Sequence, residues 1–75
     1  MNKERRKQLG ILCDKLEELK DKLDSILSDE QDYFDNMPEN LQGSMRGSDS
    51  EEAISQMEEA IDSIDDAIVL INEII

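Results

Sequence analysis

The sequence predicts an all-α fold, an antiparallel helical hairpin (αα-hairpin) that assembles into a dimeric four-helix bundle. Two long stretches repeat apolar residues in alternating steps of three and four, the spacing of one helix face. Pro38 stands between them and cannot continue a helix. The 75 residues are therefore expected to form one domain, with helices at about 3–36 and about 48–75 and a loop containing a short helical turn at 37–47.

The first helix carries a heptad seam. With Leu9 at position a, Leu12 and Leu19 fall at d, and both positions are expected to face the second helix. Cys13 falls at e and is predicted to be a small buried residue. Glu30 is the polar exception, predicted to reach solvent or to pair with a lysine. The seam residues at a and d are Leu9, Leu12, Leu16, Leu19, Leu23, Ile26, Glu30, Tyr33 and Met37, and Cys13, Leu27 and Phe34 widen the seam at e.

The second helix has an uninterrupted seam. Glu-Glu-Ala-Ile and its variants recur every seven residues from Glu51, so one surface is duplicated along the helix. Small alanines beside the seam permit close approach of a neighbouring helix. Ser48 and Glu51 match a capping box, which predicts a start at residue 48 or 49. The seam consists of Ile54, Met57, Ile61, Ile64, Ile68, Ile71 and Ile75, and the alanines are Ala53, Ala60 and Ala67.

The last turns of the second helix are apolar around their whole circumference. A 75-residue chain buries little apolar surface, and the single cysteine cannot form an intramolecular disulfide. Self-association is the remaining way to stabilise so small a domain. The residues predicted to associate with a second chain are Val69, Leu70, Ile74 and Ile75.

Charge excludes several classes of partner. The net charge is −12, and residues 23–75 contain fifteen acidic residues against one basic residue, Arg46. Such a surface repels nucleic acid, so no direct binding to nucleic acid is expected. The sequence has neither an apolar run of the ~18 residues that a membrane span needs nor a signal-peptide core. We therefore expect no membrane partner and a cytoplasmic location.

Catalysis and cofactor binding are not predicted. Histidine is absent, Cys13 is the only thiol, and the carboxylates fall on solvated faces where no pKa shift is expected. The acidic cluster from Asp29 to Glu39 lacks the spacing of a calcium loop. It leaves three interpretations open, a solvated helix end, a contact site for a basic partner, or a metal site, of which the first is preferred. The sequence therefore predicts no enzyme, no cofactor and no assigned metal ligand.

Two groups of residues are predicted to bind a protein partner. At the hairpin tip, aromatic, methionine and arginine side chains are the types favoured at interfaces, although they could instead plug the end of the bundle. On the second helix, paired acids face water. The tip group is Tyr33, Phe34, Met37, Leu41 and Arg46, and the acidic group is Glu58, Glu59, Asp65 and Asp66.

The stretch Tyr33-Phe34-Asp35-Asn36-Met37-Pro38-Glu39-Asn40-Leu41-Gln42-Gly43-Ser44, followed by the Glu-Glu-Ala-Ile repeats, resembles small acidic helical proteins of bacteriophages, prophages and mobile elements. The resemblance implies a phage or mobile-element origin. The expected function is a non-enzymatic acidic protein-binding module, an inhibitor or adaptor that occupies a basic surface on a host protein complex. The alternatives are a DNA mimic that inhibits a nucleic-acid-binding protein and a structural component of the phage particle.

Overall fold

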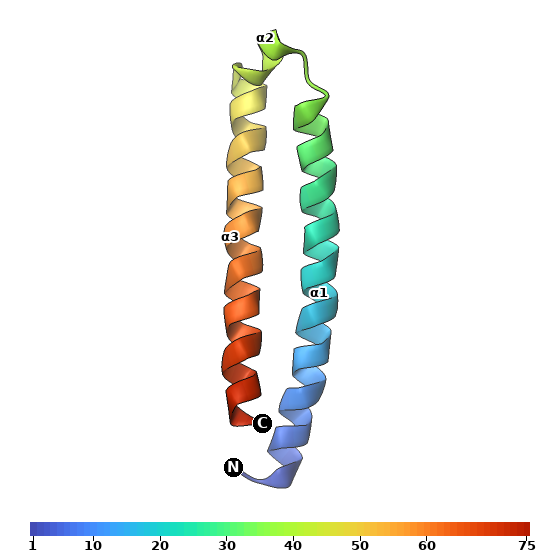
Figure 1. Ribbon diagram of the computed structural model, residues 1–75, viewed down its shortest axis with the longest axis vertical. Coiled ribbons are helices and arrows are strands. Elements are labelled where there is room, and N and C mark those ends of the chain that lie inside the picture. The colour runs from blue at the N-terminus through green and yellow to red at the C-terminus, as the bar shows by residue number, and fades with distance from the viewer.

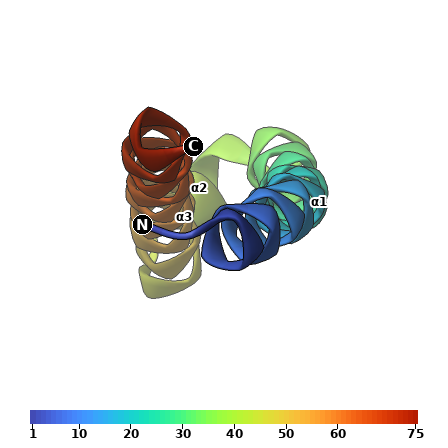
Figure 2. The ribbon, with the colours of Figure 1, turned by 90° about the horizontal axis from the view of Figure 1, so that it is seen from below.

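The computed structural model describes residues 1–75 and is an antiparallel helical hairpin. Helix α1 covers Lys3–Asp35, the single turn α2 covers Glu39–Gln42, and helix α3 covers Met45–Ile74. Helices α1 and α3 lie side by side as one layer, with α2 at the tip and both ends of the chain at the opposite, open end (Figures 1 and 2). The hairpin is a rod of 58 × 15 × 12 Å. The predicted fold class is confirmed at the level of an all-helical hairpin.

Both ends of α1 are capped by asparagine. The Oδ1 atom of Asn2 accepts a hydrogen bond of 2.8 Å from the backbone N–H of Arg5. At the other end, the backbone N–H and the Nδ2 atom of Asn36 both donate to the carbonyl of Asp32, at 3.0 and 2.9 Å. Pro38 follows at once and prevents continuation, as its sequence position predicts.

Helix α3 begins three residues earlier than the capping box predicted. Ser44 is the N-cap, and its Oγ atom accepts from the backbone N–H of Gly47 at 3.5 Å and donates to the carbonyl of Leu41. The predicted cap, Ser48, lies inside the helix and donates its backbone N–H to the carbonyl of Ser44 at 2.9 Å. The prediction was wrong because the backbone of Ser44, which follows α2 closely, already has the extended conformation of an N-cap residue, so the helix begins directly after it.

Gly47 allows α2 to pack directly on the first turn of α3. Gly47 is buried, and a Cβ atom added to it would lie 2.7 Å from the Cα atom of Gln42 and closer still to the Gln42 carbonyl group. These are backbone atoms, which cannot rotate away. A glycine inside a helix is usually unfavourable. Here it is required by the close approach of α2.

We predict that Gly47→Ala destabilises the hairpin by about 1–3 kcal/mol, the usual cost of overpacking. The matched control is Gly10→Ala, because a Cβ atom at Gly10 meets nothing within 4 Å. That substitution should stabilise by up to ~1 kcal/mol through helix propensity. Urea unfolding followed by circular dichroism measures both, and equal effects on the free energy of unfolding would contradict the assigned packing of α2.

Helix α1 presents positions a and e of its predicted stripe to α3, whereas the predicted position d lies outside the contact. Leu12, Leu19, Ile26 and Tyr33, at d, are 45, 54, 57 and 48% exposed. The rotation lets two polar residues, Lys20 at e and Glu30 at a, reach partners on α3. The buried or half-buried residues at a and e are Leu9, Cys13, Leu16, Lys20, Leu23, Leu27, Glu30 and Phe34, and Met37 continues the series after α1 ends.

Helix α3 packs through its isoleucine seam as predicted. Ile54 and Ile68 are buried, and the seam residues between them, together with Ile71, are half-buried. Ile75 is the exception and remains 52% exposed. The core is thin, because the buried apolar side chains are only Cys13, Met37, Ile54 and Ile68, and none of them is fully enclosed. No helix combines the length and apolar character needed to cross a bilayer.

Candidate functional site

A groove of about 400 Å³ opens at the hairpin tip, where α1, α2 and α3 meet. Met37 is buried and forms part of its wall, while Tyr33 and Leu41 are exposed at its edges. We call it the tip groove. Its lining residues are Tyr33, Asn36, Met37, Pro38, Leu41 and Arg46.

Hydrogen bonds fix the backbone behind the tip groove. The Nε2 atom of Gln42 donates to the carbonyls of Phe34 and Met37, each at 3.2 Å. The backbone N–H groups of Leu41 and Gln42 both donate to the carbonyl of Pro38, at 2.8 and 3.0 Å. The loop is therefore bonded to the end of α1 as well as to itself, which gives the groove a defined shape.

The structure brings together four of the five tip residues predicted from the sequence. Tyr33, Met37, Leu41 and Arg46 line the tip groove, whereas Phe34 does not. Phe34 is half-buried at position e, on the α1 face that packs against α3. The sequence reasoning missed Asn36 and Pro38 as lining residues, although their place between predicted groove residues was a signal.

The positively charged side chain of Arg46 lines the tip groove and has no ion-pair partner. It is exposed and makes no ion pair within the hairpin, where the only salt bridge joins Lys20 to Asp65. It is also the only basic residue after Lys22. Its guanidinium group is therefore available to an external carboxylate or aromatic ring.

The acidic group on α3 divides into two parts. Glu58, Glu59 and Asp66 are exposed and unpaired, as predicted. Asp65 differs, because its Oδ1 atom accepts a hydrogen bond of 2.7 Å from the Nζ atom of Lys20. The prediction that all four acids face water holds only in part at Asp65, whose side chain is 50% exposed and also serves the contact between α1 and α3.

The ion pair raises the pKa of Lys20 above its ordinary value of 10.5, first because the ammonium group donates a hydrogen bond to Asp65. The charge of Asp65 acts in the same direction. Because the folded-state pKa is raised, the stabilisation is fully present below the ordinary pKa. It is lost as the pH rises through the folded-state pKa.

We predict that Asp65→Asn lowers stability at about pH 8 and that its difference from the wild type is smaller at a second pH, above the raised pKa of Lys20, where the ammonium group is neutral. Asp66→Asn is the control, since Asp66 makes no ion pair. Its difference from the wild type should stay the same at both pH values. Urea unfolding at each pH gives the two differences, and a pH-independent effect of Asp65→Asn would contradict the role assigned to the pair.

Glu30 has a different partner from the one predicted. It is half-buried, and its Oε1 atom accepts a hydrogen bond of 3.2 Å from the hydroxyl of Ser50, a buried residue of α3. It neither snorkels to solvent nor pairs with a lysine. A carboxylate at this depth needs such a donor, and the heptad pattern could not show that a serine would supply it.

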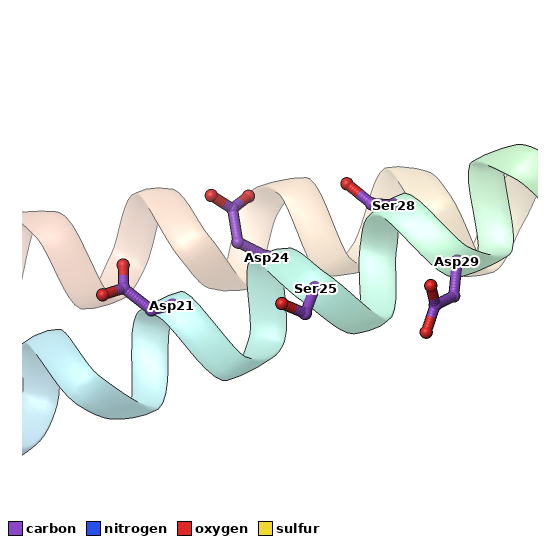
Figure 3. A pocket seen from close by; sticks show the side chains of 5 residues that line it. All are labelled: Asp21, Asp24, Ser25, Ser28 and Asp29. Atoms are coloured by element: carbon purple, nitrogen blue, oxygen red, sulfur yellow. The ribbon is translucent and has the colours of Figure 1, made fainter.

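A second, shallower hollow of about 330 Å³ lies on the outer surface of α1. Figure 3 shows that its side chains diverge, with Asp21 and Asp24 pointing away from Asp29. No group of three or more histidine, cysteine or acidic side chains converges anywhere in the structure in a way that could hold a metal ion. The hollow is lined by Asp21, Asp24, Ser25, Ser28 and Asp29.

The residues predicted to self-associate are exposed in the single hairpin. Val69, Leu70, Ile74 and Ile75 are 56, 62, 46 and 52% exposed. Val69 and Leu70 are neighbours on a helix, about 100° apart around its axis, so the four residues do not share one face. They are distributed around the last turns of α3.

The fold and its surfaces define a two-helix antiparallel hairpin with a tip groove and an acidic exterior. No known protein-family model, curated protein or solved structure matches the chain significantly.

Proposed function

We propose that this protein is a non-enzymatic acidic protein-binding module, encoded by a phage or mobile element, that inhibits or adapts a protein complex of the bacterial host. The observation that carries the proposal is the tip groove, where the exposed Tyr33 and Leu41 adjoin the unpaired Arg46. The resemblance of the tip sequence to small phage proteins supports the proposed origin.

The tip groove has the chemistry of a protein-docking site. Aromatic and arginine side chains supply a large share of binding energy at protein interfaces, particularly beside a pocket that excludes water. The volume of the groove lies within the ~300–1,000 Å³ of typical ligand pockets. A partner that inserts an apolar side chain between Tyr33 and Leu41 and offers a carboxylate to Arg46 would fit it.

The acidic exterior supplies steering toward a basic surface. With a net charge of −12 and no salt bridge at Glu58, Glu59 or Asp66, the field of these acids extends into solvent. Such a field accelerates encounter with a positively charged partner and is screened by salt. The proposed mechanism is electrostatic approach followed by docking through the tip groove.

The functional unit in this proposal is a homodimer, a four-helix bundle made from two hairpins. Two observations support it. The buried apolar core of one hairpin comprises only four side chains, and many large apolar residues, including the last turns of α3, are exposed. A second copy would cover such surface and give the small chain a fuller core.

DNA mimicry is the second candidate. Doubled acids on α3 recur at ~10.5 Å, which does not match the ~7 Å spacing of phosphates along a strand. The hollow on the outer surface of α1 favours the idea, because Asp21, Asp24 and Asp29 add acids on another face. Competition with duplex DNA for the captured target separates mimicry from docking at the groove. A structural role in the phage particle would instead make the protein a stoichiometric component of purified virions.

We predict that Leu41→Ala and Arg46→Ala each weaken binding to the captured host partner by about tenfold or more, as expected for residues at an interface centre. Affinity capture with mass spectrometry identifies the partner, and titration calorimetry with that purified protein measures the affinity. Val69→Ala is the control, an exposed apolar residue far from the groove, and should leave binding unchanged. If both groove variants bind the partner as tightly as the wild type, the tip groove is not the partner-binding site.

We predict that reversing Glu58, Glu59 and Asp66 to lysine slows association with that partner by about tenfold at low salt while changing dissociation little. Added salt should slow the wild type in the same way. Lys7→Glu makes the chain more acidic and should speed association. Stopped-flow mixing gives the rates, and association that is indifferent to salt and charge would refute electrostatic steering.

A further inference from the structure

A second apolar stripe runs along α1 outside the contact with α3. Its residues are Leu12, Leu19, Ile26 and Tyr33, seven apart, and each is about half exposed. No other part of the chain covers it, since α2 lies at the tip and the hairpin has no further layer (Figure 2). A stripe of this length and regularity has the form of a helix-packing seam.

The stripe and the alanine row of α3 lie on the same side of the hairpin. With Ile54 at position a of α3, Asp65 falls at e and the alanine row at g. Lys20, at e of α1, is bonded to Asp65, which puts the e flanks of the two helices together. The opposite flanks, d of α1 and g of α3, must then share the other side. The tip groove agrees, because it is lined by Tyr33 from d and Arg46 from g.

These two rows make one continuous surface, which we call the stripe face. At its centre, Ala60 is exposed and the neighbouring alanines are small, so another helix can approach α3 closely there. Toward the open end, Ile74 continues the alanine row and Leu70 borders it. The stripe face consists of Leu12, Leu19, Ile26 and Tyr33 from α1 and of Ala53, Ala60, Ala67, Leu70 and Ile74 from α3.

Two copies of the stripe match each other when they run in opposite directions. The d positions read Arg5, Leu12, Leu19, Ile26 and Tyr33, and they are centred on Leu19. A two-fold axis through Leu19, perpendicular to the helices, sets Leu12 against Ile26 and Arg5 against Tyr33 of a second copy. The apolar residues then meet each other, and each end pair is a guanidinium over an aromatic ring.

Charge favours the same orientation. Lys3 and Arg6 lie at the open end of α1, whereas Asp32 and Asp35 lie toward the tip. The two-fold axis through Leu19 sets Arg6 level with Asp32 of the second copy and Lys3 level with its Asp35. Parallel association would set acids against acids at the more acidic end of the molecule, which is unfavourable.

We propose that the stripe face binds a second copy of this chain in antiparallel orientation, so that each tip lies beside the open end of its partner. This inference rests on the self-association in the proposed function and specifies its surface and direction. The interface extends along α1 and takes in Leu70 and Ile74. Val69 lies outside it, on the flank of Lys20 and Asp65.

The first test is the molar mass in solution. Sedimentation equilibrium of the wild type should give twice the 8.6 kDa of one chain. Leu19→Asp places a charge on the two-fold axis in both copies, so the dissociation constant should rise at least ~100-fold. Ile11→Asp is the matched control, because Ile11 is 50% exposed and lies at position c of α1, on the side away from α3, and this variant should remain dimeric. Circular dichroism checks that each variant is still helical.

The second test is orientation by disulfide trapping, in a Cys13→Ala background that removes the only native thiol. Leu19→Cys should cross-link to itself. Leu12→Cys alone and Ile26→Cys alone should not, whereas a mixture of the two should give a mixed disulfide. Self-linking of Leu12→Cys would overturn the antiparallel arrangement.

The two tests separate this inference from the proposed function. A monomeric wild type, or a dimer that Leu19→Asp leaves intact, would overturn the stripe face as an interface. Loss of partner binding in Leu41→Ala and Arg46→Ala, with dimerisation unchanged, would still support the tip groove. If Leu41→Ala and Arg46→Ala both remain dimeric and still bind the partner, the tip groove is not the partner-binding site, whereas the stripe face remains supported as the dimer interface.

Discussion

The rotation of α1 about its own axis determines which apolar residues enter the core and which remain outside. Two polar contacts between the helices define that rotation, Lys20 with Asp65 and Ser50 with Glu30. If α1 turned to bury its d positions, both of these contacts would be lost. The hairpin therefore keeps two polar contacts within a mainly apolar seam and leaves an apolar stripe outside.

The tip depends on a different constraint, the contact of backbone with backbone between α2 and the first turn of α3. Gly47 makes that contact possible, and Ser44 begins the helix early enough to use it. Gln42 then bonds the loop to the end of α1. The tip groove and its exposed Arg46 are consequences of this packing, and the stripe reaches the groove at Tyr33. The two candidate interaction surfaces are therefore continuous.

Much of the hairpin could be predicted because its signals are local. Pro38 ends one helix, periodic isoleucines define a face of the other, and Cys13 is buried as its e position suggested. The errors arose where a local signal had a competitor. Ser48 matched a capping box, but the N-cap is Ser44, four residues earlier. Glu30 was expected to reach solvent or a lysine, but its carboxylate accepts a hydrogen bond from Ser50. Most of the tip residues were found because interface chemistry is visible in composition. Phe34 was assigned both to the tip and to the seam at e, and it lies in the seam.

The sequence by itself determined two long helices, the proline that separates them, the isoleucine seam and the strongly acidic exterior, because each follows from residues close together in the chain. Only the tertiary structure decided which side of α1 meets α3, because a stripe that includes a, d and e positions can pack in more than one rotation. The observed rotation brings together side chains distant in sequence, Lys20 with Asp65 and Glu30 with Ser50. That choice left Leu12, Leu19, Ile26 and Tyr33 exposed on one side of the rod.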